Sequence, residues 1–414
     1  MDRRRVVVTG IGAITPIGHG KEGLWKGIRE GRTGVVKISR FDTSQIHTKV
    51  AAQIDDFDPL NFFDAKLARR MDRFAQFGLA ACDMAIQDSG LAFKANGSDD
   101  RSGVTMGTAL GGISGAERQH ELYVQSGLKA VEPSLALTVF GGSGSSNIAI
   151  RYGLTGPSNA NSNSCASGAI AIGEAYRYIK DDYADVMIAA SAEAPLYELT
   201  FSAFTLIRAM STNADPGTAC RPFDKNRDGF VMGEAAAVLV LEELGHAAKR
   251  NAHIYCEVLG YSCNNDAHHM IAPRPDAASA IRAMAASLSE ARVAPADVGY
   301  INAHGSSTLL NDKTETLALK RVFGDDARRI PVSATKSMHG HALGASGAVE
   351  AAICAQVFEK DFLPPTIHYA EPDPECDLDC IPNIGRSAHV DYVLSNSFGF
   401  GGINASLVLG RLDQ

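Results

Sequence analysis

Two stretches of small residues, one in each half of the 414-residue chain, constrain the fold more than any other feature. Residues 163–169 read Asn-Ser-Cys-Ala-Ser-Gly-Ala, and residues 341–348 read His-Ala-Leu-Gly-Ala-Ser-Gly-Ala. Each stretch sets a reactive side chain, Cys165 or His341, just before a helical pattern of small residues. Such helices are stable only where other elements pack closely on both sides. The sequence therefore predicts two buried central helices, related by an internal duplication.

Short β-branched runs alternate with alanine-rich helical patterns along the chain, as in layered α/β folds. We expect nine strands, over residues 6–9, 104–106, 186–190, 236–241, 257–261, 298–302, 330–333, 392–395 and 405–409. We expect five helices, over residues 74–87, 166–179, 277–290, 313–323 and 345–358. No linker separates the halves. The prediction is one compact α/β body, a duplicated five-layer αβαβα sandwich with halves over residues 1–250 and 251–414.

Composition excludes several classes of protein. Hydrophobic residues make up 45% and charged residues 21%, which is typical of a globular enzyme. The net charge of −8 argues against nucleic acid as the main partner. No apolar stretch reaches the ~20 residues of a membrane helix, and no signal peptide is evident, so we expect a cytoplasmic protein with no membrane partner. The eight cysteines are spread singly, so we expect free thiols and no metal site.

Cys165 is the candidate nucleophile, because it precedes the first of the two small-residue helices. A helix N-terminus presents unpaired N–H groups and a positive partial charge, which lower the pKa of a thiol and favour the thiolate. The alternative is a packed structural cysteine, which is the better interpretation of any single cysteine taken alone. We expect that alternative to hold for the other seven.

Two histidines in the second half favour a nucleophilic over a structural role for Cys165. His304 lies in residues 302–308, after one predicted strand, and His341 lies after another. Each has a neighbouring glycine, and both are placed to meet a shared ligand. Taken alone, either one could be a hydrogen-bonded structural histidine. A zinc site would need three or four convergent ligands, and no close spacing supports one.

Five segments, taken together, carry a resemblance to a known family. They are residues 164–169, 221–234, 302–308, 336–347 and 396–402. In order and spacing they resemble the β-ketoacyl-acyl-carrier-protein synthases of the elongating type (synthase II-like), members of the thiolase superfamily. The likeness runs from Val6 to Leu409.

The resemblance implies a thiolase-like fold, usually a homodimer, and an acyltransferase that elongates fatty acids by Claisen condensation. Cys165 would accept an acyl chain from an acyl carrier protein. Malonyl carrier protein would then lose carbon dioxide, and its carbanion would attack the acyl-cysteine carbonyl. His304 and His341 would donate hydrogen bonds to the malonyl thioester oxygen. The backbone N–H groups of Cys165 and Phe400 would form the oxyanion hole.

The same resemblance assigns supporting roles around this site. Lys336, paired with Glu350, would order the site electrostatically, although a purely structural ion pair is equally compatible with the sequence. Phe400, flanked by glycines, would be a gate that swings when the acyl chain enters, and the plain alternative is a tight glycine turn. The residues expected to line or border the acyl pocket are Leu110, Phe204 and Ile403.

The implied partner is an acyl carrier protein, whose phosphopantetheine arm makes a cofactor of the enzyme's own unnecessary. Ser306 and Thr308 would bind the amides of that arm. Four basic residues occur where the family meets an acidic carrier helix. They are Lys66, Arg69, Arg70 and Arg208. For the first three, an ordinary solvated charged face is the alternative.

Departures from the commonest fatty-acid pattern leave rival functions open. Ser306 and Ile403 differ from the usual residues, His339 stands where threonine is usual, and residues 234–237 also differ. A ketosynthase of a type II polyketide or polyene pathway, paired with a chain-length partner in a heterodimer, is therefore the second candidate. A non-catalytic chain-length protein would lack Cys165. A thiolase acting on coenzyme A thioesters would have a second cysteine in place of His341.

Overall fold

The structure is a computed structural model that describes residues 4–93 and 99–412. Its strands are β1 (Val6–Thr15), β2 (Gly18–His19), β3 (Val35–Lys37), β4 (Val50–Ala52), β5 (Ser102–Gly107), β6 (Ser158–Asn161), β7 (Val186–Glu193), β8 (Ala235–Glu243), β9 (Cys256–Asn265), β10 (Tyr300–Asn302), β11 (Val332–Ser333), β12 (Phe362–Leu363), β13 (Arg386–Ser387), β14 (Tyr392–Gly399) and β15 (Ile403–Gly410). Its α-helices are α1 (Gly20–Arg29), α2 (Ala65–Ala68), α3 (Arg73–Ser89), α4 (Ile113–Ser126), α5 (Leu135–Thr138), α6 (Gly142–Tyr152), α7 (Ser167–Lys180), α8 (Glu198–Leu206), α9 (Leu244–Lys249), α10 (Ala278–Ala291), α11 (Leu309–Phe323), α12 (Lys336–His339) and α13 (Ser346–Lys360).

The two halves repeat one strand arrangement. The first half orders its strands β1-β8-β7-β5-β6, and the second half orders them β9-β15-β14-β10-β11. In each half the first three strands of this order pair antiparallel, and the third, fourth and fifth strands pair parallel. The halves join where β1 pairs with β9 over three residues, from Val6 to Val8. The predicted duplication is confirmed.

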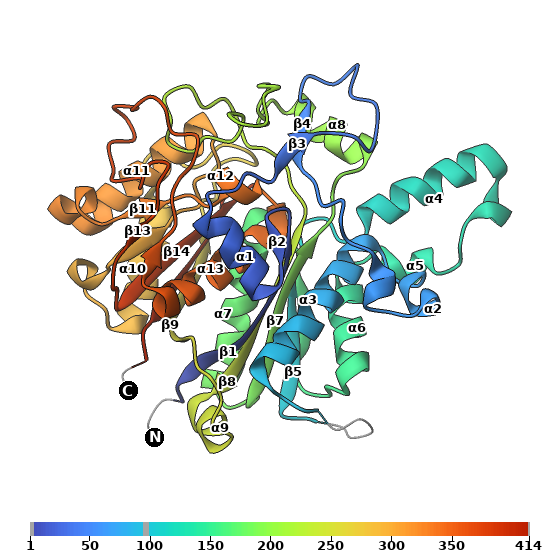
Figure 1. The fold of residues 1–414 in the computed structure, drawn as a ribbon, viewed down its shortest axis with the longest axis horizontal. Coiled ribbons are helices and arrows are strands. Elements are labelled where there is room, and N and C mark those ends of the chain that lie inside the picture. Colours follow the sequence, from blue (N-terminus) through green and yellow to red (C-terminus); the bar gives the residue numbers. More distant parts are fainter. Residues whose placement is uncertain (1–3, 94–98, 413–414) are drawn as a thin grey trace.

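The helices α7 and α13 lie against each other between the two sets of strands (Figure 1). Their contact needs small residues: a Cβ on Gly168 would lie 2.7 Å from the Ala348 nitrogen, and a Cβ on Gly347 would lie 2.7 Å from the Ala169 nitrogen. Helices α3 and α6 cover the outer face of the first half. Helix α10 covers the second half, with α11 packed against it. The predicted five-layer sandwich is confirmed.

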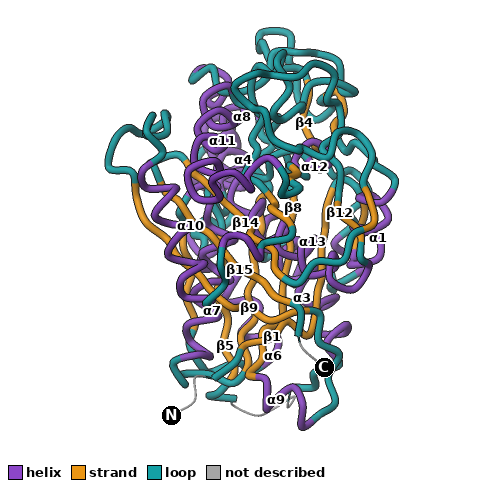
Figure 2. The backbone as a smooth tube through the Cα atoms, turned by 90° about the vertical axis from the view of Figure 1, so that its left-hand side faces the viewer, coloured by secondary structure: helices purple, strands orange, loops and turns teal. Residues whose placement is uncertain are grey.

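All nine predicted strands and all five predicted helices are present, with ends displaced by a few residues. The sequence prediction missed the helices α1, α2, α4, α5, α6, α8, α9 and α12 and the strands β2, β3, β4, β6, β12 and β13. Most of these elements are short, and the longest missed helix, α4, has Gln119 as its only buried residue. The loops gather at the end of the molecule where α8, α11 and α12 lie, and α9 lies at the opposite end (Figure 2). The loop-rich end carries the candidate site.

Candidate active site

Cys165 lies in a single turn of 3₁₀ helix, Ser164–Ala166, that leads directly into α7. Its side chain is buried, and the residue is only 6% exposed. Burial raises the pKa of the thiol to about 11, although Lys336 and the backbone N–H of Phe400 act in the opposite direction. The sequence prediction of a lowered pKa is therefore wrong, because it counted the helix terminus and not the loss of water around the sulfur.

His304 follows β10 and is fixed on both sides of its backbone. Its N–H donates to Glu315 Oε1 at 2.8 Å, and its carbonyl oxygen accepts from Lys336 Nζ at 2.6 Å. Lys336 Nζ also lies 3.4 Å from His304 Nδ1. An ammonium group can only donate, so Nδ1 accepts and the ring proton is on Nε2. His304 therefore presents an N–H donor on its other side.

His341 is held by the other half of the molecule. Its backbone N–H donates to the Val231 carbonyl at 2.7 Å, and its carbonyl accepts from the Gly233 N–H at 2.9 Å. Its Nδ1 lies 2.9 Å from Ser346 Oγ, which leaves Nε2 free to face a ligand. The His304 and His341 rings are 5.3 Å apart in an edge-to-face arrangement.

Both histidine rings are neutral. Burial lowers the pKa of His304 and His341 well below the ordinary value, and the nearby Lys336 ammonium adds to the effect. A neutral imidazole with its proton on Nε2 can donate one hydrogen bond to a substrate oxygen without bringing a formal charge. Two such donors converging on one oxygen stabilise negative charge that develops there.

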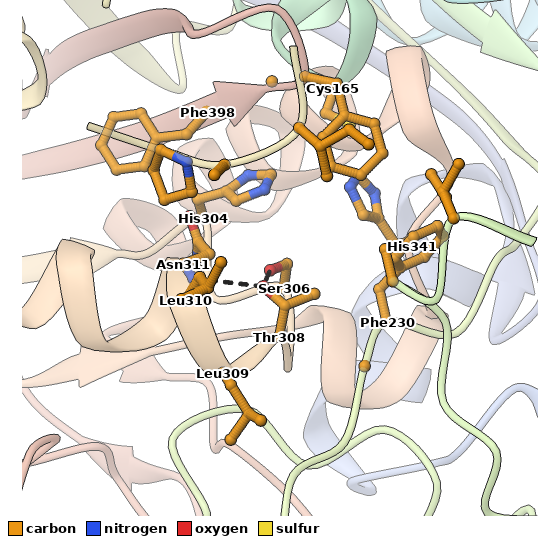
Figure 3. A pocket seen from close by; sticks show the side chains of 18 of the residues that line it. Cys165, Phe230, His304, Ser306, Thr308, Leu309, Leu310, Asn311, His341 and Phe398 are labelled. Atoms are coloured by element: carbon orange, nitrogen blue, oxygen red, sulfur yellow. Dashed lines mark hydrogen bonds between the residues drawn. The ribbon is translucent and has the colours of Figure 1, made fainter. Parts of the chain in front are cut away.

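A cavity of about 300 Å³ joins these three side chains. Figure 3 shows Cys165, His304 and His341 around it, with Phe230 and Phe398 beside the histidines. Ser306 and Thr308 also line it, and their hydroxyl groups are 2.9 Å apart. The mouth is apolar, formed by large side chains from three segments of the chain. These are Ile207, Ile271, Leu309 and Leu310.

Lys336 and Glu350 form the predicted ion pair, and both side chains are completely buried. Burial raises the pKa of Glu350 to about 7, and the lysine charge opposes that rise. Removing one partner of such a pair would leave an uncompensated buried charge, which is strongly destabilising. Lys336 Nζ also contacts two atoms of His304, so the ion pair adjoins the site.

None of the three residues predicted for the acyl pocket lines this cavity. Leu110 and Phe204, together with Phe400 of the predicted gate, pack against the apolar cluster that contains Cys165, whereas Ile403 packs against the large central core. Gly401 and Gly402, which follow Phe400, have φ angles of 84° and 73°, a conformation that favours glycine at the predicted gate.

The four basic residues predicted for docking are all exposed. Arg208 lies just after α8 and lines the cavity mouth. Lys66, Arg69 and Arg70 lie within α2 or directly after it and do not line the cavity.

Sequence reasoning missed the buried polar residues that hold the site. Glu193 and Glu315 accept backbone N–H groups beside Cys165 and His304, and Ser346 contacts His341. Their only signal in the sequence is a carboxylate or hydroxyl in an otherwise apolar segment, which does not identify a partner far along the chain.

The described residues offer no metal site and no membrane span. Within residues 4–93 and 99–412, no three histidine, cysteine or acidic side chains converge closely enough to hold a metal ion. In the same ranges no helix has the length and apolar character needed to cross a bilayer. All eight cysteines are free, as predicted, and only Cys263 is exposed.

Comparison with known proteins identifies close relatives of the whole chain. The profile of the beta-ketoacyl synthase N-terminal domain matches residues 3–247, and that of the C-terminal domain matches residues 255–370. A 3-oxoacyl-acyl-carrier-protein synthase 2 from Synechocystis sp. is 45% identical over 412 residues, which is 99% of either chain.

Two solved structures share the fold. The ishigamide ketosynthase/chain length factor superimposes with a TM-score of 0.93 at 35% identity and covers 99% of this chain and 100% of its own. A second structure holds a type II PKS acyl-carrier protein in complex with its ketosynthase, bound to the hexaketide. It matches with a TM-score of 0.89 at 34% identity, covering 99% of this chain and 100% of that one.

Proposed function

This chain belongs to the beta-ketoacyl synthase family, and from that premise we propose that Cys165, His304 and His341 carry its chemistry. The enzyme is an acyltransferase of the elongating type. It condenses an enzyme-bound acyl chain with malonyl-acyl carrier protein, with loss of carbon dioxide, to give a β-ketoacyl-acyl carrier protein in fatty acid elongation. The observation that carries the assignment of residues is the single cavity that Cys165 shares with both histidines.

The first stage is acyl transfer to Cys165. The sulfur attacks the thioester carbonyl of the incoming acyl chain, the bond to the carrier thiol breaks, and the thiol proton leaves with the carrier. The backbone N–H groups of Phe400 and of Cys165 itself lower the pKa of the thiol as hydrogen-bond donors. In this scheme they donate to the carbonyl oxygen when it becomes an oxyanion.

The second stage is decarboxylation of the malonyl thioester. The two Nε2–H groups of His304 and His341 donate to its thioester oxygen, so the carbon–carbon bond to the carboxylate breaks with the electron pair held as an enolate. Each donor supplies about 3 kcal/mol by analogy with other oxyanion donors. The carbanion then attacks the acyl-Cys165 carbonyl, the carbon–sulfur bond breaks, and Cys165 is regenerated.

Carrier docking is proposed at the cavity mouth. Arg208 supplies a positive charge for an acidic helix, and the exposed aliphatic side chains around it supply an apolar surface. Ser306 and Thr308, deeper in the cavity, would bind the pantetheine arm. No cofactor of the enzyme's own is needed in this scheme, because the reacting thioesters arrive on the carrier.

A second copy of the chain is the proposed partner for the edge strand β6. Beside this strand α6 exposes Ile150, and the segment from α4 to α5 exposes Leu128 and Leu137, each at least 70% exposed. Exposed apolar side chains and an unpaired strand edge both favour association. We propose a homodimer in the cytoplasm, and the alternative is the heterodimer of ketosynthase and chain length factor named for one structural relative.

Mass spectrometry tests the function directly. The protein is incubated with a panel of acyl carrier proteins loaded with saturated or polyunsaturated chains, and malonyl carrier protein follows. The expected result is an acyl adduct on Cys165 that is discharged as a β-ketoacyl product. An adduct on another cysteine, or none with any donor, would refute the assignment. Loading by polyene donors alone would favour the alternative, a ketosynthase subunit of a type II polyketide pathway.

A further inference from the structure

The loop after β5, residues 108–111, is held by one buried carboxylate that the scheme above does not use. Glu193, the last residue of β7, is completely buried. Its Oε2 accepts the Ala109 N–H at 2.6 Å, and its Oε1 accepts the Leu110 N–H at 3.1 Å and the Thr108 hydroxyl at 3.2 Å. A carboxylate with several donors is a strong anchor, since hydrogen bonds to a charged acceptor are about twice as strong as neutral ones.

The same carboxylate reaches the other half of the molecule. The Gly344 N–H donates to Glu193 Oε2 at 3.1 Å, and Gly344 lies three residues after His341. A Cβ on Gly344 would lie 2.4 Å from the Ala109 nitrogen and 2.7 Å from Glu193 Oε2. The approach is therefore possible only for glycine, and Glu193 connects the loop to the turn that follows His341.

The loop in turn is bonded to both flanks of the nucleophile. Ser162 Oγ donates to the Ala109 carbonyl at 2.7 Å, and Ser167 Oγ donates to the Thr108 carbonyl at 3.3 Å. These serines lie on either side of Cys165. A displacement of the loop is therefore passed directly to the position of the sulfur.

We propose that Glu193 is a positioning residue for acyl transfer, a role that rests on the proposed condensing function. Its carboxylate fixes the loop whose carbonyls hold the two flanks of Cys165 and whose Leu110 side chain packs in the apolar cluster around the sulfur. Glu193 does not line the cavity, and its hydrogen bonds go to the loop and to Gly344. Three of its hydrogen bonds hold the loop beside Cys165 and one reaches the turn after His341, so the larger effect falls on loading of the acyl chain and the smaller on decarboxylation.

The substitution Glu193→Gln tests this division. The amide keeps the volume but turns one acceptor into a donor, which then faces backbone N–H groups. Acylation of Cys165 should slow about 10- to 100-fold, the loss expected when reacting atoms are misplaced by about 1 Å. Carbon dioxide release from malonyl carrier protein, measured in a Cys165→Ala background, should stay within about twofold of that background.

Two further variants serve as a stability control and as a milder substitution at the same carboxylate. Glu242→Gln removes another completely buried carboxylate, at the other end of the sheet, and controls for lost stability. It should lower the melting temperature without slowing acylation. If Glu193→Gln does not fold, Thr108→Val removes one bond to the same carboxylate and should show the same split more weakly.

The outcomes are separable from those of the proposed function. If the wild-type protein never acquires an acyl group on Cys165, the condensing function itself fails. If the wild-type protein loads normally and Glu193→Gln either loads normally or loses both half-reactions equally, the positioning role is overturned.

Discussion

The two halves of the molecule contain the same kind of turn but place different residues in it. In each half a short 3₁₀ turn, Ser164–Ala166 or Leu343–Ala345, opens a central helix that begins with a serine. The first residue of each turn has a positive φ, 49° in one half and 41° in the other. The middle residue is Cys165 in the first half and Gly344 in the second. The first half thus has the candidate nucleophile at the position where the second half has a glycine, which carries no side chain.

Each half also has a buried glutamate that accepts backbone N–H groups near the site. Glu193 accepts the N–H groups of Ala109 and Leu110, and Glu315 accepts those of His304 and Gly305 at 2.8 Å each. Burial raises the pKa of both carboxyl groups to about 7, against the opposing effect of those N–H donors. In the proposed scheme the two halves divide the reaction, with acyl loading in the first half and decarboxylation in the second.

The largest expected effect is a loss of condensation without a loss of decarboxylation. Cys165→Ala should reduce condensation about 10³-fold or more, because the covalent stage is lost. Decarboxylation of malonyl carrier protein should continue, since both histidines remain. The measurement pairs product formation with carbon dioxide release. Loss of both activities in a folded variant would contradict a division between the halves.

Substitutions in the second half should have the reverse effect, a loss of decarboxylation without a loss of acyl loading. His304→Ala or His341→Ala should each reduce decarboxylation about 10²- to 10³-fold, as for other oxyanion donors. Acylation of Cys165, followed by mass spectrometry with a saturated acyl carrier protein, should change little. A variant that decarboxylates normally would remove that histidine from the proposed site.

A smaller effect is expected at Glu315. The substitution Glu315→Gln disturbs the anchor of the His304 backbone, so decarboxylation should fall about 10-fold through misplacement of the ring. Acyl loading should be unchanged, which is the mirror image of the result expected for Glu193→Gln. Melting temperatures of both variants serve as the common control. Identical profiles for the two variants would show that the glutamates support the fold and not separate half-reactions.

The last prediction changes only the pH and no residue. Because burial raises the pKa of Cys165 to about 11, the thiol is mostly protonated near neutrality and its thiolate fraction grows as pH rises. Alkylation of Cys165 by iodoacetamide should therefore accelerate about tenfold per pH unit between pH 7 and 9. Labelling is followed by peptide mass spectrometry, with the exposed Cys263 as the internal control. A plateau below pH 9 would indicate a preformed thiolate.

Local sequence patterns predicted the layers and the candidate reacting residues. The strand and helix periods, together with two helices that contain residues as small as Gly168 and Gly347, favour a duplicated sandwich. Ordered motifs marked Cys165, His304 and His341. Helix α4, which buries only Gln119, was missed, and so was α1, although α1 buries an apolar face.

Only the tertiary structure decided the electrostatics and the supporting bonds. The pKa of Cys165 depends on how much water the surrounding cluster excludes, and no local pattern records that. The ring proton of His304 is set by Lys336, 32 residues away, and the loop beside Cys165 is set by Glu193, more than 80 residues away. Folding brings these groups together, so their chemistry belongs to the packed molecule and not to any segment of it.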